Sequence, residues 1–237
     1  FILLKRGKVP VYKPADNIPR DEAQPQKMFG PVPEGSSVKV RLELVPAKNP
    51  HPKDDRIHVS AKSGLLMLSC RFTVEAGTYE GYSWRELWTM PVGSQPKEVE
   101  MTQGRMKSCT INHQKIRAIV EAAKGVNPSD NSAAARAARD IGSITKIDGM
   151  EFPATVKIDA GHEYNGRMYY NNEISYIVTP DRQKYKELMA GGEFINENGR
   201  TGNENQPAQQ SGSYNDNAGF DDGSFAPVPS ELEDTPF

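Results

Sequence analysis

The chain has 237 residues, enough for one ordinary domain with additional segments. Its hydrophobic content of 36% and mean hydropathy of -0.66 are low for a chain that folds throughout, which indicates a normal domain joined to a polar segment. No long uncharged apolar run predicts a transmembrane helix, and Cys70 and Cys109 alone make no disulfide framework. We therefore expect a soluble, cytoplasmic protein.

Charge is segregated along the chain, although the net charge is only -2. Residues 196–237 contain eight acidic residues and one basic residue, whereas residues 1–195 carry a net charge of +5. A mildly basic body with an acidic tail is typical of a protein that binds a polyanion, although basic bodies are common.

The chain begins with a proline-rich basic stretch over residues 1–35, which has no hydrophobic periodicity. This composition predicts an extended arm lying on the surface or on a ligand, and a lead-in strand tied onto the domain is an equal alternative. Alternating apolar residues then predict strands over Ser37–Val45, Leu65–Val74 and Tyr82–Met90, with a loop over residues 46–58.

The period changes in the middle of the chain. Apolar residues at helical spacing predict a helix over residues 108–123, and Ser132 caps a second helix over residues 133–140. Alternation returns over residues 152–158, and Asn165-Gly166 predicts a hairpin to a strand over residues 167–178, with a bulge at Asn171-Asn172. A short helix is expected from Thr179-Pro180 to Gly191.

These elements predict a mainly β domain over residues 36–191. Five strands with a helical insert between the third and fourth fit a five-stranded, oligonucleotide-binding (OB)-fold-like barrel, with a small antiparallel sandwich as the alternative. Residues 192–237 are dominated by Gly, Asn, Gln, Ser and Asp, so we expect a disordered acidic tail.

Aromatic and basic residues gather on the predicted strands. Single-stranded nucleic acid is bound by aromatic rings that stack on bases and by cations that contact phosphates. The candidates for nucleic-acid binding are Arg71, Tyr82, Trp84, Arg85, Trp88, Lys107, Arg167 and Tyr170. Because strands favour aromatic residues, some of these rings must instead belong to the core.

Catalytic chemistry has no support in the sequence. No phosphate-binding loop, nucleophile elbow or His-Glu-x-x-His string is present, and the four histidines fall in separate predicted elements. We expect a protein that is not an enzyme, with no cofactor and no metal site.

The last residues, 231–237, combine acids with a Pro-Phe ending. An apolar pocket rimmed by Arg or Lys in a partner protein would complement this tip. The residues expected to dock are Glu231, Glu233, Asp234, Pro236 and Phe237, although most acidic tails only solvate a protein.

This ending resembles the acidic tip of bacterial single-stranded DNA-binding proteins, with Thr235 at the position where an aliphatic residue is usual. The runs Ser63-Gly64-Leu65-Leu66-Met67-Leu68, Tyr79-Glu80-Gly81-Tyr82-Ser83-Trp84 and Tyr164-Asn165-Gly166-Arg167 are similar to a bacteriophage family of small, replication-associated single-stranded DNA-binding proteins. The similarity covers about residues 35–180.

The resemblance implies a protein that coats single-stranded DNA during phage replication, recombination or repair in the host-cell cytoplasm. Its tip would recruit replication or recombination proteins, or compete with DNA for the groove. We also expect that the chain can form homo-oligomers. Two alternatives remain at this stage: a strand-annealing or recombination-mediator protein, and an adaptor that docks on replication proteins without binding nucleic acid.

Overall fold

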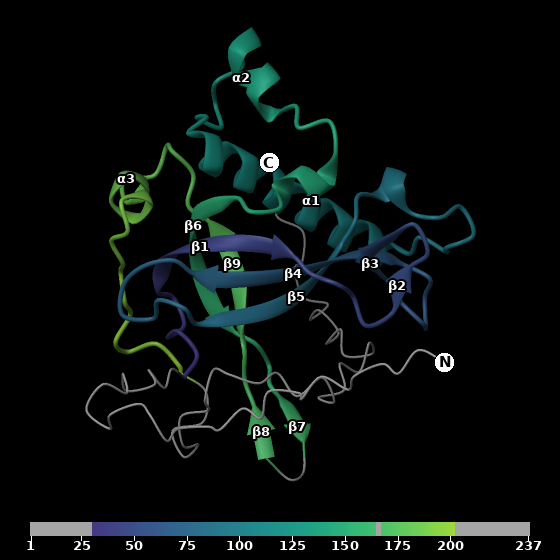
Figure 1. The fold of residues 1–237 in the computed structure, drawn as a ribbon, viewed down its shortest axis with the longest axis horizontal. Coiled ribbons are helices and arrows are strands. Elements are labelled where there is room, and N and C mark those ends of the chain that lie inside the picture. Colours follow the sequence, from purple (N-terminus) through teal and green to yellow (C-terminus); the bar gives the residue numbers. More distant parts are fainter. Residues whose placement is uncertain (1–29, 165–166, 202–237) are drawn as a thin grey trace, which may run out of the picture.

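A computed structural model describes residues 30–164 and 167–201 (Figure 1). The helices are α1 (Gln103–Lys124), α2 (Ala133–Arg139) and α3 (Tyr185–Met189), with short 3₁₀ turns η1 (Val92–Ser94) and η2 (Ile144–Ile147). The strands are β1 (Ser37–Leu44), β2 (Pro50–His51), β3 (Asp54–Val59), β4 (Leu66–Val74), β5 (Ser83–Thr89), β6 (Glu151–Ile158), β7 (His162–Tyr164), β8 (Arg167–Tyr169) and β9 (Asn172–Ile177).

The main sheet is antiparallel and curls into a half-barrel, which confirms the prediction of a mainly β domain. Neighbouring strands follow the path β5-β4-β1-β6-β9, and β3 and β2 extend the sheet from the edge of β4 that also pairs with β1. Successive antiparallel pairings make β5 and β9 parallel to each other. The curl brings these two end strands together, and the backbone N–H of Ile174 in β9 donates to Glu86 in β5 at 2.7 Å.

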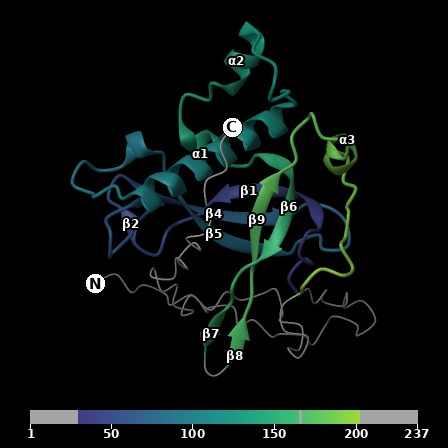
Figure 2. The ribbon, with the colours of Figure 1, turned by 180° about the vertical axis from the view of Figure 1, so that it is seen from behind.

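Alternation along the strands places apolar side chains on the concave face of this sheet. Val40 in β1, Phe72 in β4 and Phe152 in β6 are fully buried there. The helix α1 contributes Ile116 and Ile119 to the same core, so it covers the concave side. Figure 2 shows α1 and α2 on one side of the sheet and the β7–β8 hairpin projecting at the opposite end.

The predicted loop over residues 46–58 is wrong, and this changes the position of the helical insert. Residues 50–59 form the hairpin β2–β3, so α1 follows five strands rather than three. The nine-residue β4 pairs with two strands along the same edge. Its residues 70–74 pair with β1, and its residues 66–68 pair with β3, where Ile57 stands opposite Leu68. Asp54 and Asp55 lack the alternation that identifies a strand in the sequence. Residues 54–59 form β3 because they pair with the long strand β4.

Local signals locate the helix ends and the hairpin. The Thr102 side chain caps α1 at its start, and Gly125 ends the helix with φ of 66°, a left-handed conformation that glycine adopts without a steric penalty. Strands β7 and β8 are antiparallel, with Tyr164 opposite Arg167, and the predicted turn Asn165-Gly166 lies outside the described residues. The predicted strand over residues 167–178 is divided into β8 and β9, and the register shift falls opposite Thr155/Val156 rather than at Asn171-Asn172.

Segments on both sides of residues 36–191 pack onto the sheet. Val32 is fully buried, and its backbone N–H donates to the Asn172 side chain at 2.8 Å. Phe194 forms an isolated bridge with Ser37, and the Arg200 guanidinium donates to the Ile158 carbonyl at 3.0 Å. The folded unit therefore includes residues that the composition assigned to the arm and to the tail.

The remainder of the predicted arm and tail, with the docking tip, lies outside the described residues. In the described ranges, no helix is both long enough and apolar enough to span a membrane.

Candidate nucleic-acid interface

The outer, convex face of the sheet carries the charged side chains of β1 and β4 and, from β5, Arg85. Strand register places Arg71 of β4 between Glu43 of β1 and Arg85 of β5. The apolar neighbours of these residues along each strand are buried, so the alternation of side chains turns both arginines away from the core. Two of the sequence-predicted phosphate contacts are thus brought side by side on one face.

Ion pairs connect this cationic pair to β1. The Arg71 Nη1 lies 3.8 Å from a Glu43 carboxylate oxygen, and Arg41 lies 4.0 Å from the same side chain. Arg41 also contacts Glu75 at 3.0 Å. Along the same face, Lys39 contacts Glu151 at 2.7 Å. We define the outer-face cluster as Lys39, Arg41, Arg71 and Arg85 together with the acids Glu43, Glu75 and Glu151.

The juxtaposition of Arg71 and Arg85 is the most informative feature of the outer-face cluster. Strand register sets these two cations directly opposite each other on neighbouring strands. Glu43, the carboxylate near Arg71, is shared with Arg41. Two neighbouring cations can both contact an anion that lies across β4 and β5, which makes this face suited to a phosphate backbone.

Both tryptophans are core residues. Trp84 is fully buried and Trp88 is 2% exposed, and both pack against Phe72 at ring-centroid distances of 5.6 and 5.3 Å. Tyr82 is 8% exposed and stacks on Trp84. A base has no access to these ring faces in this conformation, so we do not include the three rings in the proposed surface.

A carboxylate explains the orientation of both indoles. Glu86 accepts hydrogen bonds from Trp84 Nε1 at 2.9 Å and from Trp88 Nε1 at 2.7 Å, and it also accepts the backbone N–H of Ile174. Lys115 of α1 lies over the Trp88 ring at 5.3 Å and donates to the Ile174 carbonyl at 2.6 Å. The Glu86–Lys115 pair therefore joins β5, β9 and α1 where the half-barrel comes together.

Burial changes the protonation behaviour of this pair. Removal of the carboxylate from water raises the pKa of Glu86, while Lys115 and the three N–H donors act in the opposite direction. Burial also lowers the pKa of Lys115, although Glu86 partly counters this effect. We interpret Glu86 and Lys115 as structural residues, because they link β5, β9 and α1 and contact the tryptophan rings.

Exposed aromatic rings occur on and next to β9. Tyr176 is 54% exposed and pairs with Thr155 of β6. It lies two residues after Ile174, whose backbone N–H donates to Glu86 of β5. Tyr170 is partly exposed at the base of the β7–β8 hairpin, where the Arg200 guanidinium lies 5.9 Å from its ring. Arg167 begins β8, but its side chain lies outside the described part of the chain.

Lys107 does not join the outer-face cluster. It is exposed on α1, which packs against the concave side of the sheet. The sequence candidates therefore divide into four groups: the Arg71–Arg85 pair on the outer face, the buried rings of Tyr82, Trp84 and Trp88, Lys107 on α1, and Arg167 with Tyr170 at the β7–β8 hairpin. Lys39 and Arg41 were not among the candidates, although strand alternation already predicted that they face away from the core.

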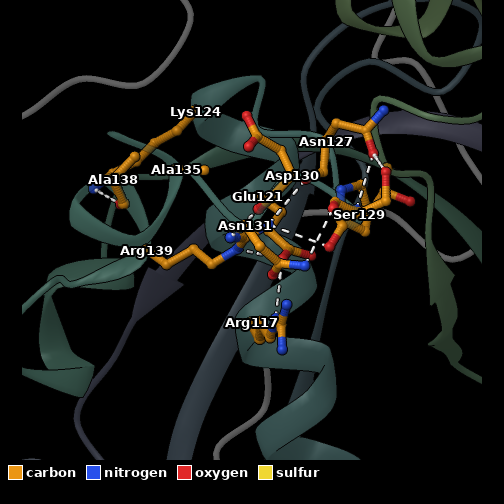
Figure 3. A network of polar contacts seen from close by, with 12 residues as sticks. Arg117, Glu121, Lys124, Asn127, Ser129, Asp130, Asn131, Ala135, Ala138 and Arg139 are labelled. Carbon is orange, nitrogen blue, oxygen red and sulfur yellow. Dashed lines mark hydrogen bonds and ion pairs between the residues drawn. The ribbon is translucent and has the colours of Figure 1, made fainter. Parts of the chain in front are cut away.

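A second polar cluster fixes α2 onto the C-terminal half of α1 (Figure 3). Glu121 is 3% exposed and accepts from Arg117 at 2.9 Å and from Arg139 at 2.6 Å. Arg139 also donates to the backbone carbonyls of Asp130 and Asn127. Because each partner is internal to the α1–α2 connection, we interpret this cluster as a structural anchor.

Within residues 30–164 and 167–201, no group of three or more His, Cys, Asp or Glu residues is placed to hold a metal ion. No protein-family model matches the chain, and no curated protein matches it.

Proposed function

We propose that this chain is a non-catalytic single-stranded DNA-binding protein. The DNA backbone crosses the outer face of β4 and β5, where Arg71 and Arg85 stand opposite each other. That juxtaposition is the observation that carries the proposal, because two neighbouring cations on one outer face can contact successive phosphates.

The strand order supports this assignment. Without the β2–β3 hairpin and the small β7–β8 sheet, the path β5-β4-β1-β6-β9 with β9 beside β5 has the order expected of an OB-fold. Proteins of this fold bind oligonucleotides on the face of their second and third strands, between the loops joining strands 1–2 and 4–5. Here those strands are β4 and β5, and those loops hold the β2–β3 and β7–β8 hairpins.

Tyr176 and Tyr170 are the rings that we propose for base stacking, because they retain exposure that Trp84 and Trp88 lack. The proposed role is coating of single-stranded DNA during phage replication, recombination or repair. The tip at residues 231–237 would recruit replication or recombination proteins.

The test is a titration of fluorescein-labelled oligo-dT with the full chain, followed by fluorescence anisotropy. We expect binding at micromolar protein or below that weakens steeply with salt, and weaker binding to a duplex of the same length. Tryptophan quenching is a poor readout, since both indoles are buried and bonded to Glu86. Absence of an anisotropy change at low salt would overturn the proposal.

A further inference from the structure

The N-terminal half of α1 presents a cationic and apolar surface that α2 leaves uncovered. Residues 103–120 include Arg105, Lys107, Lys115 and Arg117 and no acidic residue. The anchor around Glu121 holds α2 on the other half of the helix (Figure 3). Figure 1 shows α1 on the side of the sheet opposite the β7–β8 hairpin.

Exposed apolar side chains occur on α1 and on the turn that adjoins it. Val92, Met106 and Ile111 are 44%, 41% and 43% exposed, and they are three of the four large exposed hydrophobic residues in the described ranges. Val92 belongs to η1, which packs against α1. Exposed apolar residues on two packed elements indicate an interaction site more strongly than residues scattered over the molecule do.

Cationic and apolar groups are interleaved at short range on the helix. Lys107 and Ile111 are separated by one helical turn, so their side chains are neighbours on the exposed side. Lys107 has no ion-pair partner among the described residues, whereas Lys115 and Arg117 are engaged with Ile174 and Glu121. Glu98 and Glu100 precede the helix and limit the cationic surface at that end. We call Val92, Met106, Lys107 and Ile111 the α1 patch.

We propose that the α1 patch is the docking site for the tip of this same chain, residues 231–237. The tip combines Glu231, Glu233 and Asp234 with Leu232 and Phe237, which complements a cation flanked by apolar side chains in both charge and hydrophobicity. About 30 residues separate Thr201 from the tip. With the coil dimensions that its composition predicts, such a linker spans about 30 Å, which exceeds the roughly 15 Å radius of gyration of a domain of this size.

Docking at the α1 patch would hold the tip away from partner proteins until they compete for it. This site does not depend on nucleic-acid binding, because it lies on a different element from Arg71 and Arg85.

The direct test uses a fluorescein-labelled peptide with the sequence of residues 230–237. It is titrated with the full chain carrying Asp234→Asn and Phe237→Ala, so that the internal tip does not compete. We expect saturable binding that weakens about tenfold on adding Lys107→Glu, and by a similar factor on adding Ile111→Ser. Lys186→Glu on α3, which makes the same charge change at another exposed position, should leave the affinity within about twofold.

A second measurement places the tip in the intact chain. A photo-crosslinking phenylalanine analogue at position 237 should attach to residues 92–117, as mapped by mass spectrometry. Equal weakening by Lys107→Glu and Lys186→Glu would overturn the proposal, since it would reduce the effect to net charge. Crosslinks confined to β4 and β5 would also overturn it. So would a Lys107→Glu variant that loses oligo-dT affinity and keeps peptide affinity, because α1 would then be a nucleic-acid surface.

Discussion

Replacing Arg71 and Arg85 together with glutamine removes the two opposed cations from the outer face and keeps polar side chains of moderate length. The Arg71 side chain is 38% exposed and its nearest carboxylate, Glu43, is 3.8 Å away. Exposed ion pairs of this kind contribute little to stability. We therefore expect a nearly unchanged free energy of unfolding.

The effect on DNA binding follows from counterion release. For single strands, the logarithm of the binding constant falls with the logarithm of the salt concentration by about 0.7 per phosphate contact. One contact is then worth about 1 kcal/mol at 0.1 M salt relative to 1 M salt, or about fivefold in affinity. The double variant should bind oligo-dT about 25-fold more weakly at 0.1 M salt, with a salt slope reduced by about 1.4.

The assay is anisotropy of labelled oligo-dT over a series of salt concentrations, with urea unfolding to verify the fold. The matched control replaces Arg182 and Lys186, two exposed cations at α3, with glutamine, which changes the net charge equally. The reasoning is refuted if the control loses as much affinity as the double variant, or if the salt slope of the double variant is unchanged.

Four further changes test separate parts of the structure. Glu43→Gln should tighten oligo-dT binding severalfold in the anisotropy assay, because the carboxylate competes with phosphates for Arg71. Tyr176→Ala should cost about 1–3 kcal/mol of binding free energy in the same assay, with no loss of stability, since the ring is 54% exposed. Glu121→Ala should lower the free energy of unfolding in urea by about 3 kcal/mol, because it leaves Arg139 without its carboxylate, while oligo-dT affinity is unchanged. Glu86→Gln should alter the pH dependence of stability, as measured by urea unfolding over a range of pH values.

The sign of the Glu86 effect follows from its raised pKa. The folded protein holds the Glu86 proton more tightly than the unfolded chain does. The stabilising contribution of this group is therefore fully present below its ordinary pKa of 4.5 and is lost as the pH rises through the raised value. The stability of the wild-type chain relative to Glu86→Gln should decrease over that window, by at most about 1.4 kcal/mol per pH unit.

Each of these predictions has a contradicting result. Weaker binding by Glu43→Gln would mean that the arginines need that carboxylate for their orientation. Full affinity in Tyr176→Ala would remove this ring from the interface. Unchanged stability in Glu121→Ala would show that the backbone carbonyls suffice to hold Arg139, and a pH-independent difference for Glu86→Gln would show that the carboxyl does not titrate differently on unfolding.

The sequence determines the elements whose signals are local. Alternation in Ser37–Leu44 and Leu66–Val74 and the cap at Ser132 depend on neighbouring residues, so these features can be predicted before the fold is known. The start of α1 could not: the apolar spacing predicted it at residue 108, and the helix begins at Gln103. The outward direction of Arg71 and Arg85 follows from the same alternation, since a strand turns successive side chains to opposite faces.

Only the tertiary structure decides which outward and inward residues meet. Trp84 and Tyr176 both belong to strands with aromatic residues, but packing under α1 buries the first and leaves the second exposed. The pairing of β3 with β4 and the contact between Glu86 and Ile174 join residues that are distant in sequence. Such contacts depend on how the sheet curls, a property of the whole set of strands rather than of any one segment.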